Sequence, residues 1–464
     1  MSGDKFQDKI KFSFFGGAQE VTGADYLLEG EKEGRKTALL IDCGFFQGQR
    51  MSEEKNKEPF PFDIKSVDAV LITHAHIDHI GRIPKLVKDG YRGKIFSTIP
   101  TKEFSEIMLE DSLGILLKES KYNGKQDLVY DTNDIVRAIG QWETIDYHKE
   151  FNVGDFKITF KDAGHILGSA MIEIKFKDKK IVFSGDLGNP PNPLLKETEK
   201  IIDADYLIIE STYGDREHEP LEDANLKLER VIEDTVHKGG VLMIPVFSIE
   251  RTQKILFEIN DFVEHGRIPR VPIFLDSPLA IKATNIYKKN QRYFNENAKN
   301  IIRSGDELFN FPGLKMTPTV EESKAINEVP APKIILAGSG MSNGGRIVHH
   351  ERRYLPDPKS ALLLIGYQAA GSLGRHLQEG AETVKIIGEI IPVKAKIENI
   401  SGYSSHPDTN ELFDLVHDTA DTLKKVFVVQ GEAKRSLFFV QKIRDCLGVD
   451  AVAPKFGETH KFKI

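Results

Sequence analysis

The first part of the chain, up to about residue 210, consists of short apolar runs separated by turn residues. KFSFFGG, TALLIDCG and VDAVLIT are runs of this kind, and FKITFKDAG alternates apolar with charged positions as a half-buried strand does. In MIEIKFKDKKIVFSGD, a hairpin would place Ile172, Ile174 and Phe176 on one face and charged residues on the other. This pattern predicts a strand-rich region with few helices.

From about residue 213 to 385 the pattern changes, because apolar runs now alternate with segments of helical periodicity. The apolar runs are GGVLMIPVF, VPIFLD, KIILAG and ALLLIGY, and the helical segments include LEDANLKLERVIEDTVHK and SIERTQKILFEINDFVEH. This alternation is typical of a parallel α/β sheet. Further strands and an amphipathic helix follow. We therefore predict a strand-rich domain formed by residues 1–212 and 388–464, interrupted by an α/β insertion at 213–387.

Composition and charge narrow the classes of protein that remain. A chain of 464 residues is too long for one ordinary core, which agrees with two domains. The net charge of -7 excludes a protein coated in basic charge for nucleic acid, although it allows a local basic groove. The two cysteines, Cys43 and Cys446, exclude a disulfide framework and a cysteine-based zinc ribbon. A charged amino terminus without a long apolar run predicts a cytoplasmic protein and no membrane partner.

The segment THAHIDHIGR has the highest density of candidate metal ligands, because three histidines and an aspartate fall within six positions. A strand would point His74 and His76 to the same side, and Asp78 and His79 follow at the turn into a helix-like segment. One loop can thus direct four ligands at a common volume. Imidazole and carboxylate ligands without a thiolate suit zinc, with manganese as the alternative, and favour a catalytic over a structural site.

Other candidate ligands follow apparent strands and lie among small residues. They are His165 in DAGHILGSA, Asp186 in FSGDLGN and His406 in SGYSSHPD. A single residue of this kind is more often structural, but with the cluster they make five histidines and two aspartates. That set would fill two cation sites with one aspartate bridging. Two cations about 3.5–4 Å apart form a clamp for hydrolysis of a phosphate ester.

These motifs resemble those of a known family. THAHIDH is similar to the HxHxDH signature of the metallo-β-lactamase fold, an αββα sandwich, and GAQEVTGADYLLE, LLIDCGFFQG, DAGHILGSAMIEI and FSGDLGN resemble its later landmarks. IIESTYGDREH, GSLGRHLQEG and ISGYSSHPD resemble the three motifs of the β-CASP subgroup, whose extra α/β domain is inserted at the predicted position. The resemblance covers essentially the whole chain. It is strongest to the catalytic subunit of mRNA 3′-end cleavage factors and to compact bacterial homologues.

The resemblance also assigns roles to individual residues. It implies one cation held by His74, His76 and His165, a second held by Asp78, His79 and His406, and Asp186 bridging them. We expect two zinc ions, or manganese. Asp42 would orient a ligand histidine, and Glu210 and His376 match the first and second β-CASP motifs. In the mechanism that we expect, His376 would protonate the leaving 3′-oxygen, and Glu210 would orient His376 or tune its pKa. A histidine at position 406 is the pattern of RNA-type members, so we expect single-stranded RNA as the substrate; a homodimer is inferred from relatives.

Two further segments bear on function. LAGSGMSNGGRIVHH runs from a strand through a glycine-serine turn into a helix, so Ser339, Ser342 and Arg346 are candidate donors to a substrate phosphate. A plain structural turn is the alternative, because a lone glycine pattern is weak evidence. Near the end, the chain reads VQGE where many relatives read VHGE, so Gln430 replaces a histidine and cannot carry charge.

Together these observations predict a zinc-dependent ribonuclease that cuts internally and leaves 5′-phosphate and 3′-hydroxyl ends. Three alternatives stay open: a 5′-to-3′ exoribonuclease, a thioester or lactam hydrolase on the same fold, and a non-catalytic RNA-binding scaffold. The complete ligand set argues against the scaffold, and the insertion with its histidine motif argues against a small substrate.

Overall fold

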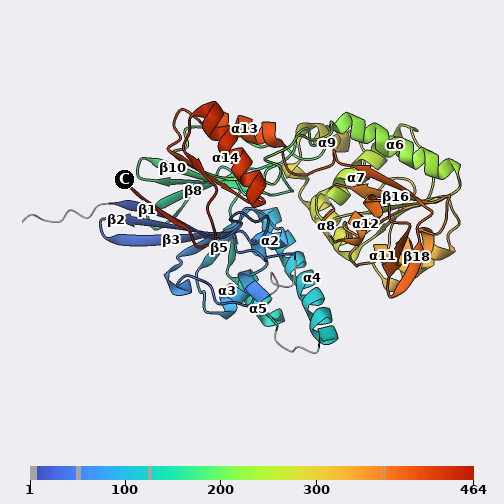
Figure 1. The fold of residues 1–464 in the computed structure, drawn as a ribbon, viewed down its shortest axis with the longest axis horizontal. Helices are drawn as coiled ribbons and strands as arrows, with labels where there is room; N and C mark the ends of the chain where they lie inside the picture. The colour runs from blue at the N-terminus through green and yellow to red at the C-terminus, as the bar shows by residue number, and fades with distance from the viewer. Residues whose placement is uncertain (1–7, 49–53, 124–127, 367, 370) are drawn as a thin grey trace, which may run out of the picture. The chain divides into compact units, whose positions relative to one another are not determined.

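The computed structural model describes residues 8–48, 54–123, 128–366, 368–369 and 371–464. By the contacts among its own residues, the chain divides into two compact units (Figure 1). Unit 1 comprises Met1–Pro190, Lys196–Glu217 and His406–Ile464, and unit 2 comprises Pro191–Leu195 and His218–Ser405. Among the described residues, no helix combines the length and apolar character needed to cross a membrane.

Unit 1 contains two seven-stranded sheets. The first has the order β22 (Thr459–Lys463), β1 (Lys9–Gly16), β2 (Asp25–Lys32), β3 (Arg35–Ile41), β4 (Ala69–Leu71), β5 (Lys94–Ser97), β6 (Trp142–Thr144). The second has the order β21 (Ala451–Val452), β20 (Lys425–Val429), β11 (Tyr206–Glu210), β10 (Lys179–Phe183), β9 (Ala170–Phe176), β8 (Phe156–Asp162), β7 (Phe151–Val153). Their inner faces share one apolar core, in which Phe12, Leu28, Phe160 and Phe427 are all buried. The predicted β9–β10 hairpin is confirmed: the strands pair antiparallel, and its three apolar residues are buried in this core.

Helices cover the outer faces of these sheets, which completes the predicted αββα sandwich. α13 (Thr409–His417) and α14 (Ala433–Leu447), red in Figure 1, pack Leu412 and Phe439 against Leu207 and Val428 of the second sheet. The first sheet carries η1 (Ile64–Ser66), α2 (Ile77–Ile80), α3 (Ile83–Lys88), α4 (Ile99–Asn123) and α5 (Thr132–Gly140). α4 was not predicted, because its apolar residues are spread around the helix and give no amphipathic signal.

Unit 2 is built on a six-stranded, all-parallel sheet, as the alternating pattern predicted. Its order is β14 (Leu314–Met316), β13 (Ile273–Asp276), β15 (Lys333–Ala337), β12 (Val241–Pro245), β16 (Ala361–Ile365), β19 (Lys396–Ile400). The helical elements are α6 (Leu221–His237), α7 (Arg251–Glu264), α8 (Pro278–Lys289), η2 (Gln291–Tyr293), α9 (Glu296–Arg303), α10 (Val320–Ala325), η3 (Ile326–Glu328), α11 (Ile347–Tyr354) and α12 (Leu373–Gln378). A hairpin of β17 (Thr383–Ile386) and β18 (Glu389–Pro392) completes the unit.

The second predicted boundary, at residue 387, needs correction. β19 pairs parallel with β16, so residues 388–405 belong with the insertion and not with the completing part of the strand-rich domain. A short piece of the preceding chain also joins unit 2, because Leu195 bridges to Phe294 and the carbonyl of Leu194 accepts from Asn295 at 2.9 Å. An apolar run predicts a strand but does not say which sheet receives it, so neither assignment was readable from the sequence.

Candidate metal centre

The loop after β4 carries four of the predicted ligands, and the neighbouring chain holds it in place. The four are His74 and His76, which precede or begin α2, and Asp78 and His79, which lie inside it. The amide of Cys43 donates to the carbonyl of His79 at 2.8 Å. A Cβ atom at Gly44 would lie 1.5 Å from the carbonyl oxygen of Asp78, so only glycine allows this approach.

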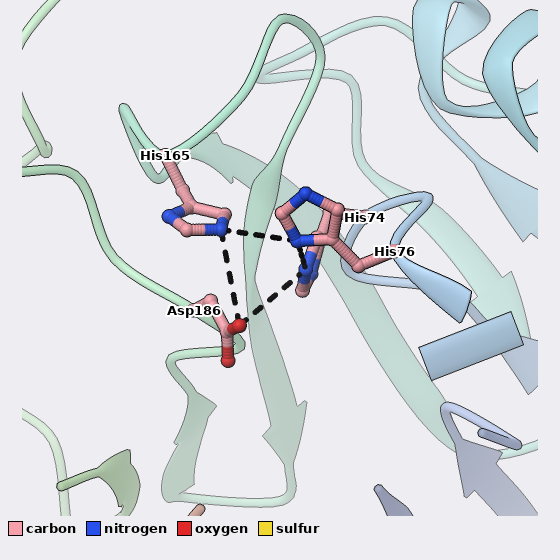
Figure 2. Close-up of side chains that lie close together, drawn as sticks. All are labelled: His74, His76, His165 and Asp186. Carbon is pink, nitrogen blue, oxygen red and sulfur yellow. Dashed lines mark hydrogen bonds and ion pairs between the residues drawn. The ribbon is translucent and has the colours of Figure 1, made fainter. Parts of the chain in front are cut away.

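Three imidazoles and one carboxylate converge on a single point (Figure 2). They belong to His74, His76, His165 and Asp186, which offer ligand atoms within 4.8 Å of one another. His76 Nδ1 lies 3.0 Å from Nε2 of His74 and 3.3 Å from Nε2 of His165. Asp186 Oδ2 lies 3.5 Å from His74 Nε2 and 3.8 Å from His165 Nε2. Three separate loops, after β4, β8 and β10, therefore supply one set of ligands.

A second set of ligand atoms faces the other oxygen of Asp186. Asp186 Oδ1 lies 3.3 Å from His79 Nε2, and Asp78 Oδ2 lies 3.8 Å from that same nitrogen. His406, in the segment between β19 and α13, offers a ligand atom within 4.8 Å of those of Asp186 and Glu210. The two oxygens of Asp186 thus face different histidines, which is the arrangement that a bridging carboxylate requires.

Asp42, directly after β3, is buried behind His79. Its Oδ1 accepts from the amide of Thr73 at 2.8 Å, and its Oδ2 lies 2.8 Å from both the Thr73 hydroxyl and Nδ1 of His79. An ionised carboxylate only accepts hydrogen bonds, so Nδ1 of His79 carries a hydrogen and its Nε2 is directed to the cluster. This contact is the one that the predicted orienting role of Asp42 requires.

Burial and neighbouring charges shift the pKa values of the cluster in two directions. Burial lowers the pKa of His74 and His76, and nearby imidazoles lower it further, so both rings are neutral and offer lone pairs. Burial also opposes charge on His79, but the surrounding carboxylates outweigh it and raise its pKa well above the usual value. Burial raises the pKa of Asp78 to about 6. Burial opposes charge on Asp186 too, yet His79 and His74 hold its pKa well below the usual value.

A divalent cation fits this donor set. Asp186 Oδ1 is buried without a hydrogen-bond partner among the described residues, and such an atom is costly unless something satisfies it. Imidazole and carboxylate ligands without thiolate match zinc or manganese. The residues that could hold cations are the seven predicted from the sequence: His74, His76, Asp78, His79, His165, Asp186 and His406.

Glu210, the last residue of β11, has a histidine of its own unit as a partner. It is fully buried, and its two oxygens lie 3.2 and 3.1 Å from Nδ1 of His406. Its Oε1 also accepts from the amide of Leu187 at 2.7 Å. These contacts orient the ring of His406, and the expected role of Glu210 toward His376 stays a prediction.

His376 lies on α12 of unit 2, where its side chain is exposed. It lines a cavity of about 620 Å³ together with Ser342, Asn343 and Lys385. This volume falls within the range of small-ligand sites. An exposed imidazole on a cavity wall is accessible to a substrate, and its role in proton transfer stays a prediction.

The glycine-serine turn after β15 is held by its own polar side chains. The hydroxyl of Ser342 donates to Glu351, and Arg346 donates to Asp276 Oδ1 at 2.7 Å and to main-chain carbonyls. Ser342 is 1% exposed. Ser342 and Arg346 thus hold the turn to its own unit, and their role as phosphate donors stays a prediction. The hydroxyl of Ser339 makes a longer contact, 3.4 Å to a main-chain carbonyl, so Ser339 stays a candidate.

Two residues complete the surroundings of His79. Gln430, directly after β20, places Nε2 3.0 Å from Nε2 of His79, and its Oε1 accepts from the hydroxyl of Tyr26 at 3.2 Å. Both side chains are buried. The altered VQGE motif was the one sequence signal for Gln430, and Tyr26 gave none, since it reads as an ordinary aromatic residue of a strand.

Family profiles match three stretches of this chain. They describe a metallo-beta-lactamase superfamily domain at residues 33–203, a Beta-Casp domain at 252–377 and a Zn-dependent metallo-hydrolase RNA specificity domain at 390–454. A ribonuclease of Thermus thermophilus is 38% identical over 96% of this chain and 98% of its own length. An RNase J-like protein of Methanocaldococcus jannaschii is 35% identical over 97% of this chain and 99% of its own.

More distant likenesses agree with these matches. The transcription termination factor FttA of Methanosarcina mazei is 29% identical over 96% of this chain and 70% of its own length. A crystal structure of a protein of unknown function from Enterococcus faecalis has a TM-score of 0.56 at 12% identity, covering 98% of this chain and 100% of that one. At that identity the likeness shows the fold alone.

Proposed function

The chain belongs to the β-CASP family of metallo-β-lactamase-fold ribonucleases, and on that basis we propose that it cleaves single-stranded RNA internally. The products would carry 5′-phosphate and 3′-hydroxyl ends. The observation that carries the proposal is the carboxylate of Asp186, one oxygen of which faces His74 and His165 while the other faces His79. The match of an RNA specificity domain to residues 390–454, which include His406, supports RNA as the substrate.

We assign two zinc ions to the centre, with manganese as the alternative. The first position comprises His74, His76 and His165, the second comprises Asp78, His79 and His406, and Asp186 is shared. When bound, such cations acidify water and offset the charge that builds on the phosphate in the transition state. The identity and number of the cations, like the homodimer, stay predictions that native mass spectrometry can measure.

Two carboxylates orient the rings of ligand histidines through hydrogen bonds. Asp42 holds Nδ1 of His79, so its Nε2 is directed to Asp186, and Glu210 holds Nδ1 of His406. The low pKa of Asp186 keeps its carboxylate ionised at neutral pH, so both oxygens remain available. The chain thus prepares its ligands before any cation or substrate arrives.

The remaining requirement is a proton for the leaving group, and we assign it to His376. As a bond forms between water oxygen and phosphorus, the bond from phosphorus to the 3′-oxygen breaks. An imidazolium at His376 would donate its proton to that oxygen, which yields the 3′-hydroxyl end. The exposure of His376 on a cavity wall supports this role.

One observation favours a second candidate, a 5′-to-3′ exoribonuclease. The cavity of about 620 Å³ has room for a terminal nucleotide, and Ser342, Asn343, Gly344 and His376 line it. A cavity that captured the 5′-end would restrict cleavage to that end. The two candidates share the metal centre and differ in the length of their products.

The test uses a single-stranded RNA of about 30 nucleotides with a 5′ label and an internal fluorophore. Internal fragments that require cations would establish an endoribonuclease. Mononucleotides released from the 5′-end alone would establish the exoribonuclease. Intact RNA together with hydrolysis of a thioester or lactam would overturn the proposed substrate, and a 2′,3′-cyclic phosphate product would overturn the mechanism.

Variants of two exposed histidines test the proton donor. We expect His376→Ala to lower kcat by about 100- to 10,000-fold, the usual contribution of a general acid. His265→Ala, at another exposed histidine of unit 2, serves as the matched control. Equal activity of the two variants would remove His376 from the mechanism. A chelator-treated sample and the matching DNA complete the set.

A further inference from the structure

The short helix that carries His376 depends on neighbouring segments for its position. α12 has six residues, too few for a helix to be stable in isolation. Leu377 is buried in an apolar core of unit 2, and Leu373 packs against that core. Apolar packing is not directional, so polar contacts are needed to fix where the imidazole of His376 lies.

Gln368, in the segment that leads into α12, makes a buried contact with the glycine-serine turn after β15. Its side chain is 1% exposed, and its Nε2 donates to the carbonyl of Gly340 at 3.1 Å. A carbonyl oxygen only accepts, so this contact fixes which end of the carboxamide faces the turn. The other end lies against the helix, because a Cβ atom at Gly374 would lie 2.0 Å from Oε1 of Gln368. The side chain of Gln368 therefore fills the space between the turn and α12.

Two further hydrogen bonds join the turn directly to α12. The amide of Leu373, the first residue of the helix, donates to Oδ1 of Asn343 at 3.1 Å. The amide of Gly374 donates to the carbonyl of Met341, also at 3.1 Å. The first amides of a helix have no partner within it, so the turn supplies acceptors that α12 itself lacks.

The turn is held firmly enough to support the helix. Ser342 is 1% exposed, and its hydroxyl donates to Glu351 of α11. The amide of Ile347 donates to the carbonyl of Gly338 at 2.9 Å. A Cβ atom at Gly345 would lie 2.3 Å from that same carbonyl oxygen, so the turn is closely packed on itself. A helix bound to such a turn takes its position from it.

We propose that Gln368 and Asn343 are positioning residues, which hold α12 against the glycine-serine turn and so place the imidazole of His376. Gln368 is too deeply buried to touch RNA, so it acts through the helix. Asn343 lines the same cavity as His376, so contact with the substrate is the other role open to it. The inference rests on the proton-donor role of His376 in the proposed function.

The experiment measures kcat and KM for RNA with the full-length protein. We expect Gln368→Leu to lower kcat about 10- to 100-fold with little change in KM, because a misplaced proton donor loses its alignment with the leaving oxygen. Asn343→Ala removes one neutral hydrogen bond and should lower kcat about three- to tenfold. Asn343→Asp should keep kcat near that of the unaltered chain, since a carboxylate also accepts from the amide of Leu373. Its added charge would act on KM.

Double substitutions show whether these residues act through His376. In the His376→Ala background, Gln368→Leu or Asn343→Ala should leave the residual rate unchanged, because the group that they position is gone. A further loss of kcat with Gln368→Leu in that background would overturn the inference. A further loss with Asn343→Ala alone would show that Asn343 contacts the RNA, and would overturn its part of the inference.

Thr319→Ala is the matched control, because Thr319 caps another helix of unit 2 with an exposed side chain. Its kcat should not change. Hydrogen exchange of the α12 amides, measured by mass spectrometry, gives a readout that needs no cleavage. Exchange should rise in Gln368→Leu and Asn343→Ala but not in Thr319→Ala.

Thermal denaturation checks that each variant is folded, and if Gln368→Leu unfolds, Asn343→Ala and its rescue by Asn343→Asp decide the result. Unchanged kcat and unchanged exchange in the substituted proteins would overturn the inference. Raised exchange together with normal cleavage by His376→Ala would uphold the contact between the turn and α12 and reject the proton donor. The failure of the inference is thus distinguishable from the failure of the proposed function.

Discussion

Two polar segments of this chain, residues 73–79 in unit 1 and residues 338–346 in unit 2, follow strands in parallel pairing. β4 pairs with β3 and β5, and β15 pairs with β12 and β13. Both segments therefore lie at the carboxyl edge of a parallel ladder, where ligands commonly bind. Their side chains nevertheless behave in opposite ways. In the first segment histidines face other histidines, whereas in the second Ser342 and Arg346 each face a complementary partner.

The difference shows what distinguishes a metal centre from a turn that holds itself together. Neutral imidazoles and an ionised carboxylate gathered at one point are all acceptors toward that point, so a cation is the group that satisfies them together. The donors Ser342 and Arg346 already have the acceptors Glu351 and Asp276. Donors that are already paired with acceptors thus indicate a structural role, whereas a cluster made only of acceptors indicates a site for a cation.

The largest effect should come from removing the carboxylate that both cation positions share. We expect Asp186→Ala to reduce RNA cleavage by about 1,000-fold or more, because several kcal/mol of charge stabilisation depend on the cations. Its melting temperature should change little in the presence of a chelator. Asp178→Asn, at an exposed aspartate of the β9–β10 turn, is the control. Cleavage by Asp186→Ala within tenfold of the unaltered chain would contradict the metal assignment.

A substitution at Arg346, in the turn after β15, should lower the free energy of unfolding and leave RNA cleavage unchanged. Arg346→Ala leaves the buried carboxylate of Asp276 without its guanidinium, which typically costs about 3 kcal/mol or more. Urea denaturation should show this loss. KM for RNA, measured well below the unfolding transition, should hardly change. A raised KM in a fully stable variant would instead restore Arg346 as a phosphate donor.

Glu210→Gln tests which histidine that residue acts on. A neutral amide holds Nδ1 of His406 less firmly, so we expect zinc affinity at the second position to fall about 10- to 100-fold. Excess zinc should then restore much of the activity. If Glu210 instead tuned His376, the variant would shift the pH profile of kcat and leave zinc affinity unchanged. Glu143→Gln, at an exposed glutamate of β6, is the control.

The smallest effect concerns acid stability of unit 2. Burial opposes the charge of Asp276, but hydrogen bonds from His350, Ser323, Arg346 and Thr317 outweigh it and lower its pKa to about 2. The unfolded value is about 3.9, so the ionised group contributes stability that is complete above that pH and is lost as pH falls toward 2. Asp276→Asn should flatten this part of the stability curve in urea titrations, whereas Asp261→Asn should not. An unchanged slope would contradict the shift.

The fold and the ligand set followed from local signals, and the contacts between distant segments did not. The alternation in β9 and the density of histidines at 74–79 are properties of a few neighbouring residues. The partner of Glu210, at position 406, and that of Arg346, at position 276, depend on how loops meet in space. The contact from His79 to Gln430 joins residues 351 positions apart. Periodicity carries no information on such pairs, so the contact of Glu210 with His406 was not predicted.

Unit 1 is formed by segments on both sides of the insertion, so its predicted metal ligands are not translated together. The ligands of the proposed first cation position, with the shared Asp186, are all made within the first 186 residues, before any of unit 2. His406 is the first residue of unit 1 after the insertion, so it is translated only when all of unit 2 has been made. A growing chain consequently lacks a ligand of the proposed second cation position until all of unit 2 has been made. The order of translation thus delays the complete ligand set while the nascent chain is still next to messenger RNA.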